Sequence, residues 1–164
     1  EGGHLAARGA PVALDPINAS ADTEIAFLNA VYDYLLDTNI LSAHLRHPSG
    51  QQHRFVQHSG RLFTTTIALA ELYEWAYQRS DPAAVLTAVD KMLLHEVGTI
   101  EFDNDCAMEC GRLRAELRRQ GIGVAALDLL IAAVALSFDL TLVTHNTKDF
   151  QNIPGLRLED WLEP

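Results

Sequence analysis

The sequence lacks several features that mark particular protein classes. Only two cysteines occur, Cys106 and Cys110, too few for the disulfide framework of a small secreted protein. Their spacing of four on a predicted helix allows zinc ligation or a disulfide but favours two reduced, half-buried thiols. No apolar run approaches the roughly 18 residues of a membrane span, and the first residues do not resemble a signal peptide. We therefore expect a soluble, cytoplasmic protein with no membrane association.

Cationic residues are few: 12 Lys and Arg stand against 22 Asp and Glu, a net charge of −10 at pH 7. This balance argues against a broad nucleic-acid-binding surface. Between Asp37 and Glu71, however, there is no acidic residue. The cationic and titratable side chains of this window are Arg46, Arg54, Arg61, His44, His47, His53 and His58. The window predicts either a solvated basic helix pair or a patch that tolerates phosphate beside an acidic centre.

The length of 164 residues and the 48% of hydrophobic residues suit one main domain with a substantial core. Residues 1–30 differ from the rest, because they are rich in Ala, Gly and Pro and show no core pattern before Ile25. We expect residues 31–164 to form the domain and residues 1–30 to be an extension of open origin. Within the extension and its junction, DTEIAFLNAVY predicts a short helix capped by Asp22 or Thr23.

Short apolar strands alternate with helices along the remaining sequence. Strands are predicted at residues 34–36, 62–64, 98–102, 140–144 and 156–161. Helices are predicted at 38–46, 51–58, 64–81, 83–95, 104–120 and 128–139, with a turn at 48–50. Thr65 or Thr66 is the expected N-cap of the third. This alternation predicts an α/β fold whose parallel sheet is covered on both faces. Ligands bind such sheets at the carboxyl ends of the strands.

Four acidic residues have apolar neighbours that set them apart from ordinary surface acids. Asp37 follows the apolar YLL, Glu71 lies within IALAELYEW, Asp128 begins DLLIAAVAL, and Asp149 follows the predicted strand of LVTHN. Each also has a plain structural explanation. Asp37 and Asp128 suit helix N-caps, Glu71 suits an exposed helical position, and Asp149 suits a turn.

The joint placement of these acids favours a catalytic interpretation. Three of the four fall at strand ends or helix starts, and Glu71 lies on the first turns of a helix that enters from the same edge. Crowded carboxylates repel one another unless a cation neutralises them. Hard oxygen ligands without a His or Cys set favour Mg²⁺ or Mn²⁺ over zinc. The sequence therefore predicts metal-dependent phosphoryl chemistry, such as phosphodiester hydrolysis.

The blocks YLLDTNIL, ALAEL, GVAALDLLIAAVAL and LTLVTHNTKDF…LRLEDW occur in this order between Val31 and Trp161. As a set they resemble the PIN domain of the VapC toxin type. The resemblance implies a three-layer α/β/α fold with a four- to five-stranded, mainly parallel sheet. It also implies an Mg²⁺- or Mn²⁺-dependent endoribonuclease that hydrolyses RNA with a metal-activated water. Such a toxin is expected to form a homodimer and to be held inactive by a VapB-like antitoxin.

The resemblance also implies roles for individual residues. Asp37, Glu71 and Asp128 match the acidic positions of the motifs, and Asp149 is our choice for the fourth, as catalytic residues and metal ligands. The supporting polar residues are Thr144, Asn146 and Asn39. The expected RNA contacts are Arg46, Arg54, Arg61 and His145, although simple exposure is the alternative for His145, which stands where the family often has arginine.

Three matters stay open from the sequence. The basic run RLRAELRR (residues 112–119) is either an ion-paired helix face, through Arg112 and Glu116, or a surface for an RNA backbone or an acidic antitoxin. Residues 1–30 could be a tag remnant, a native extension or an antitoxin-like segment whose Arg8 reaches the carboxylates. A catalytically silent PIN fold that binds RNA or protein is the alternative function, although retention of all four acids argues against it. A haloacid-type phosphatase is disfavoured by Asn39, which stands where that class needs a second aspartate.

Overall fold

A computed structural model describes residues 33–162 of the chain. Two predictions, the short helix that begins near Asp22 and the reach of Arg8 toward the carboxylates, lie outside the described residues. Within the described part, no helix is long and apolar enough to cross a membrane.

Five short strands form one parallel sheet in the order β3-β2-β1-β4-β5. Their bounds are Tyr34–Leu36 (β1), Leu62–Thr65 (β2), Gly98–Ile100 (β3), Thr141–Val143 (β4) and Arg157–Glu159 (β5). In the register of the central strand, Leu35 lies beside Phe63 of β2 and Leu142 of β4. The three residues of β1 and of β4 are all buried, as expected for a parallel sheet covered on both faces.

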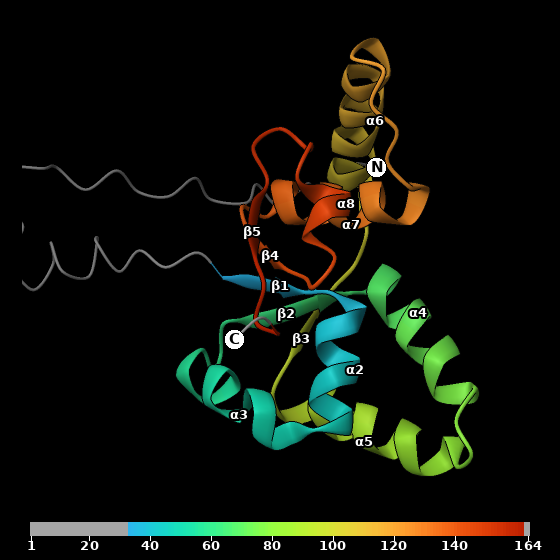
Figure 1. Ribbon diagram of the computed structural model, residues 1–164, viewed down its shortest axis with the longest axis vertical. Helices are drawn as coiled ribbons and strands as arrows, with labels where there is room; N and C mark the ends of the chain where they lie inside the picture. The colour runs from blue at the N-terminus through green and yellow to red at the C-terminus, as the bar shows by residue number, and fades with distance from the viewer. Residues whose placement is uncertain (1–32, 163–164) are drawn as a thin grey trace, which may run out of the picture. The chain divides into compact units, whose positions relative to one another are not determined.

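Helices cover both faces of this sheet (Figure 1). The helices on one side are α2 (Thr38–Arg46), α3 (Pro48–Gln57), α4 (Thr66–Tyr77) and α5 (Pro82–His95). Those on the other side are α6 (Asn104–Arg119), α7 (Ala126–Ser137) and the single turn α8 (Thr147–Phe150). The three-layer α/β/α arrangement predicted from the sequence is therefore confirmed.

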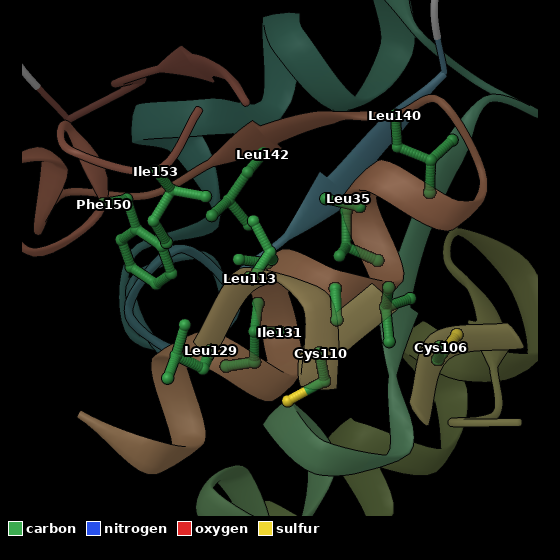
Figure 2. Close-up of a cluster of buried hydrophobic side chains, with 14 of the residues drawn as sticks. Leu35, Cys106, Cys110, Leu113, Leu129, Ile131, Leu140, Leu142, Phe150 and Ile153 are labelled. Carbon is green, nitrogen blue, oxygen red and sulfur yellow. The ribbon is translucent and has the colours of Figure 1, made fainter. Parts of the chain in front are cut away.

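Alternate residues of the central strand feed two separate cores. Tyr34 and Leu36 pack with α2 to α5, whereas Leu35 packs with α6 and α7. Figure 2 shows the second of these cores, with Leu35 of the sheet facing Leu113 of α6 and Ile131 of α7. The period of two that separates the faces of a strand explains this division. In α6, Cys106, Cys110, Leu113 and Leu117 recur at spacings of four, three and four, and all are buried in the same core.

Several local predictions needed correction. The predicted turn at 48–50 is wrong, because α3 begins at Pro48, whose fixed φ suits the first helical position. The cysteines are free, as expected, but Cys106 and Cys110 are fully rather than half buried. Helix α7 begins at Ala126 after Ala125, so Asp128 lies in its first turn and does not cap it.

Candidate active site

Two neighbouring strands end in polar residues at the point where the strand order reverses. The chain passes from β1 to β2 on one side of the sheet, whereas β4 lies on the other side of β1. Asp37 follows β1 and Thr144 follows β4, and both are buried. The carboxyl edge of a parallel sheet at such a reversal is the usual place for a ligand crevice.

The Asp37 carboxylate is held by three donors. Its Oδ1 accepts a 2.8 Å hydrogen bond from the amide of Thr38, so Asp37 is also the N-cap of α2. Its Oδ2 accepts from the Thr144 hydroxyl at 2.8 Å and from the Asn39 side-chain amide at 3.0 Å. The amide of Asp37 donates to the carbonyl of Val143 at 3.0 Å, which continues the β1–β4 pairing. Asp37 is therefore both the N-cap of α2, the alternative that the sequence allowed, and a fixed carboxylate at the carboxyl edge of the sheet.

Asn39 ties the start of α2 to the end of β4. Its Nδ2 also lies 3.1 Å from the Thr144 hydroxyl, and its Oδ1 accepts from the amide of His145 at 3.0 Å. The Thr144 hydroxyl in turn accepts from the amide of Asn146 at 3.1 Å. The supporting residues expected from the sequence, Asn39, Thr144 and Asn146, therefore form one hydrogen-bonded network with Asp37. Asn146 contributes through its backbone.

Glu71 reaches the same edge from α4. The Thr38 hydroxyl lies 2.9 Å from Glu71 Oε2 and 3.1 Å from the carbonyl oxygen of Ala68. Thr65, at the end of β2, caps this helix through its hydroxyl, as predicted. Glu71 is partly buried, so it does not occupy the exposed helical position that the sequence offered as an alternative.

The other two acids are less constrained. Asp128 is partly buried in the first turn of α7, and Asp149 is exposed in α8. Among residues 33–162, neither side chain has a hydrogen-bond partner, whereas the Asp37 and Glu71 side chains both do. Their carboxylate oxygens are available for a ligand.

The four acids influence one another electrostatically. Burial, together with the charges of Asp149, Asp37 and Glu71, raises the pKa of Asp128 to about 6. The pKa of Asp37 is also raised, mainly by burial, with a smaller contribution from Asp149 and with opposition from its hydrogen bonds. Each raised pKa reflects an anion that is costly to leave without a counter-charge. A cation that enters the site would relieve this cost.

The donor set fits a hard divalent cation rather than zinc. It consists of carboxylate oxygens with neighbouring amide and hydroxyl oxygens, which Mg²⁺ and Mn²⁺ prefer. Within the described residues, however, no three His, Cys, Asp or Glu side chains lie close enough together to form a ready cation cage. The four carboxylates are therefore near enough to interact electrostatically but not close enough for three of them to bind one cation without moving.

The four cationic residues expected to contact RNA are spread over the molecule. Arg61 precedes β2, at the amino ends of the strands, and its Nε lies 3.2 Å from Asp33. Arg54 stacks over the Trp161 ring at 5.7 Å, and Arg46 lies at the end of α2. Only His145 borders the Asp37 network, where its exposed imidazole lies 2.9 Å from Asp160. The structure thus brings one of the four to the carboxylate edge.

Two supporting residues were missed in the sequence. Thr38 positions Glu71, and Asp160 holds the ring of His145. Thr38 could have been found, because it directly follows Asp37 and its hydroxyl lies at the start of the same helix. Asp160 offered no comparable signal, since its approach depends on how the segment after β5 returns to the end of β4.

Comparison with known families gives one match over most of the described chain. The PIN domain family model matches residues 34–156. The tRNA(fMet)-specific endonuclease VapC of Shigella flexneri is 33% identical over 129 residues, which cover 78% of this chain and 97% of the relative. The ribonuclease VapC2 of Haemophilus influenzae is 32% identical over 130 residues, with 79% and 98% of the two chains covered.

Solved structures give the same result. A chain from the crystal structure of DNA-bound VapBC from Salmonella typhimurium superposes with a TM-score of 0.74 at 32% identity, covering 80% of this chain and 99% of the other. VapBC2 from Rickettsia felis, bound to a fragment of promoter DNA, gives a TM-score of 0.72 at 32% identity, with 78% and 98% covered.

Proposed function

The chain belongs to the PIN domain family and, within it, to the VapC ribonucleases, and from this premise we propose how its residues cleave RNA. It is an endoribonuclease and the toxin component of a toxin–antitoxin pair. We propose that Asp37, Glu71, Asp128 and Asp149 are its catalytic carboxylates. The observation that carries this assignment is the hydrogen-bonded network that holds the Asp37 carboxylate at the carboxyl edge of the sheet, which Glu71 reaches through Thr38. Burial, with smaller contributions from the charges of Asp149, Asp37 and Glu71, raises the pKa of Asp128 beside it.

The four carboxylates are the proposed ligands of Mg²⁺ or Mn²⁺. When bound, such a cation supplies a Lewis acid for a phosphate oxygen and a water of lowered pKa. The protein supplies the geometry. Thr144 and Asn39 fix the orientation of the Asp37 carboxylate, and Thr38 fixes that of Glu71. Preorganised groups of this kind avoid reorganisation during the reaction.

The two less constrained acids have a different proposed part. Asp128 and Asp149 keep their oxygens free of hydrogen bonds among residues 33–162, so they can move toward a cation as it binds. Their charges also repel RNA phosphates when no cation is present. The site therefore favours substrate and cation together over substrate alone.

The substrate is proposed to be structured RNA, with initiator tRNA the first candidate to test because a relative carries the name tRNA(fMet)-specific endonuclease. His145 is the favoured RNA contact of the four expected, because it borders the site. Arg46 and Arg54 are the more distant proposed contacts, because they lie farther along their helices. Arg61 is disfavoured as an RNA contact, because it pairs with Asp33 at the opposite ends of the strands.

Further assignments complete the proposal. A VapB-like antitoxin is the inhibitory partner, as solved neighbours are VapBC complexes, and a homodimer is the proposed assembly. Residues 31–164 are proposed as the PIN domain and residues 1–30 as an extension. The cytoplasm is the proposed location, because the RNA substrate must share a compartment with the enzyme.

The test compares Asp37→Asn with Asp90→Asn, which removes an exposed acid of α5. With Mn²⁺ and a labelled tRNA, Asp37→Asn should lower kcat by roughly a hundred- to a thousandfold, the usual loss for one preorganised group. Asp90→Asn should leave kcat unchanged, and both variants should melt cooperatively. Equal cleavage by Asp37→Asn, with contaminating nuclease removed, contradicts the assignment. RNA binding without cleavage by the unaltered chain would instead favour the silent binding module.

A further inference from the structure

Trp161 anchors the segment of residues 160–162, which follows β5 and belongs to no helix or strand. Its side chain is only 7% exposed. The ring of Tyr34 in β1 lies 5.2 Å from the indole, and His58 at the end of α3 stacks on it at 5.4 Å. The Arg54 guanidinium lies over the same indole at 5.7 Å. Side chains from a strand and from a helix therefore enclose this tryptophan.

The backbone of residues 160–162 has little other support. Within residues 33–162, no hydrogen bond between backbone groups joins these three residues to another part of the chain. The Leu162 amide donates instead to Asp160 Oδ1 at 2.8 Å, which closes a local turn. The indole N–H of Trp161 donates to Glu159 Oε2 at 2.8 Å, also locally. Burial of the indole, beside the partly buried Leu162, therefore decides where the segment lies.

One carboxylate joins this anchor to the edge of the candidate active site. Asp160 Oδ1 closes the turn that contains Trp161, whereas its Oδ2 lies 2.9 Å from His145 Nδ1. The His145 backbone belongs to the Asp37 network, because its amide donates to Asn39. The Asp160 side chain is 10% exposed and the His145 side chain 53%. The anchor therefore fixes the less exposed member of the pair, and the exposed ring takes its orientation from that member.

The pair also decides which nitrogen of His145 is presented to a ligand. An ionised carboxylate can only accept a hydrogen bond, so Nδ1 carries the proton. Nε2 is then the available nitrogen, and among residues 33–162 it has no hydrogen-bond partner. If Asp160 were not held in place, the exposed ring would rotate and exchange its two tautomers. Both the orientation and the tautomer of the imidazole therefore depend on Asp160.

We propose that Trp161 is a positioning residue for His145: burial of its indole holds Asp160, and Asp160 holds the imidazole with Nε2 presented to RNA. This inference rests on the proposed function, which takes His145 as the RNA contact that borders the site. A platform on which a base stacks is the competing role for a tryptophan in an RNA-cleaving protein. The burial of the indole and its stacking with His58 exclude that role.

Nuclear magnetic resonance of the full chain, labelled with ¹⁵N-histidine, tests the positioning directly. The His145 ring signals are identified by their loss in His145→Gln. In Trp161→Leu they should move toward the signals of Asp160→Asn, whose side-chain amide both donates and accepts and so fixes neither tautomer. Trp161→Phe keeps an aromatic ring in the slot and should retain the unaltered signals. If Trp161→Leu does not fold, the bulkier Trp161→Met takes its place.

The matched control is Trp75→Leu, because Trp75 packs against the same core from α4, with Arg79 over its ring. This control should leave the His145 ring signals unchanged. With labelled tRNA and Mn²⁺, Trp161→Leu should raise KM by up to roughly fivefold, the most that an exposed pair contributes, and kcat should change less. Adding Asp160→Asn to Trp161→Leu should raise KM no further, because both substitutions act on one pair.

Two results would overturn the positioning role. The first is a folded Trp161→Leu chain whose His145 signals are unchanged, since the ring then keeps its orientation without the anchor. The second is an equal movement of these signals in Trp75→Leu, since any loss of core packing then disturbs the ring. If the signals move only in the Trp161 variant but the unaltered chain does not cleave RNA, the positioning role stands and the proposed function fails.

Discussion

The two halves of the candidate site are built in different ways. The fixed half comprises Asp37 and Glu71, and the donors Thr38, Asn39 and Thr144 hold these two carboxylates in place. The open half comprises Asp128 and Asp149, whose carboxylates have no hydrogen-bond partner among residues 33–162. Both halves carry the same functional group, but only the first is oriented before a cation arrives.

The difference teaches how such a site avoids a large folding cost. Four ionised carboxylates held rigidly together would repel strongly at low dielectric. Fixing two of them with donors offsets part of this cost, because hydrogen bonds favour the ionised form. Leaving the other two more exposed lets water screen their charges. Variants in each half should therefore behave differently.

The largest effect is expected in the open half, for Asp128→Asn. The variant should lower kcat by roughly a hundredfold or more, since one proposed ligand of the catalytic cation is lost, yet the cation-free chain should become more stable. Between the ordinary pKa of Asp near 3.8 and its folded pKa of about 6, the folded state holds an extra proton. Stability from Asp128 is therefore lost as pH rises through this window.

Thermal melting in EDTA shows whether Asp128→Asn stabilises or destabilises the cation-free chain. Asp128→Asn should melt higher than the unaltered chain at pH 7.5, and the difference should shrink as the pH is lowered through 6 toward 3.8. Added Mn²⁺ should raise the melting temperature of the unaltered chain more than that of the variant, because a ligand that binds the folded state stabilises it. A variant that melts lower than the unaltered chain at pH 7.5 would contradict the repulsion.

A smaller effect is expected in the fixed half, for Thr144→Val. The substitution keeps the shape but removes the hydroxyl that donates to Asp37 and accepts from the Asn146 amide. Because a supporting partner of a ligand is lost, kcat should fall roughly 10- to 100-fold. Unlike Asp128→Asn, this variant should be less stable by about 1–3 kcal/mol, as buried groups lose partners. Urea unfolding at pH 7.5 checks the sign, and a stabilised Thr144→Val would erase the distinction between the halves.

Thr38→Val probes the link between Glu71 and the rest of the fixed half. It should lower kcat by up to roughly tenfold, since the Glu71 carboxylate loses its 2.9 Å partner and must be oriented by the cation instead. Raising the Mn²⁺ concentration should recover part of the activity. Thr66→Val, one position into α4 and exposed, is the matched control. If no Mn²⁺ concentration restores activity to Thr38→Val, Thr38 does not act by orienting Glu71 for the cation.

The smallest effect is expected at the rim, for Asp160→Asn. Asp160 lies 2.9 Å from His145 Nδ1 and orients a half-exposed ring. Exposed pairs contribute little, about 0–1 kcal/mol, so cleavage should change no more than severalfold and through KM. His145→Gln should give a similar change. The same substitutions made together should add nothing further if the pair acts as a unit, and a multiplied loss would show separate roles.

The sequence predicted the fold well where apolar pattern and local caps agree. Helix α2 was placed at its observed bounds, because the apolar stop at Asp37 and the helical spacing after it both indicated a start. Helix α3 was placed late, because Pro48-Ser49-Gly50 reads as a turn in isolation. Pro48 instead stands at the first helical position, which its fixed φ suits, and the helix packs on α2 through Phe55 stacked on His44 at 3.7 Å.

The site was predicted less completely than the fold. Asp37, Asn39 and Thr144 could be expected together, since parallel strands end at one edge. The grouping of Asp128 with them depends on where α7 begins, and its helix starts two residues earlier than the sequence suggested. Arg61 was misleading, because its place in an acid-free window gave no sign that it lies beside Asp33 at the other end of the strands. Charge patterns along a chain do not report which sheet edge a residue occupies.

The hydrogen bond between Thr144 and Asp37 has a consequence for the order in which the protein is made. Its two residues lie 107 positions apart in the chain. A ribosome produces Asp37 long before β4, so the carboxylate that anchors the site emerges without the strand and hydroxyl that fix it. A nascent chain that has not yet released β4 and Thr144 therefore lacks the hydroxyl that fixes Asp37. If Asp37 has its proposed role, we expect RNA cleavage to begin only after residues past Thr144 are free to fold.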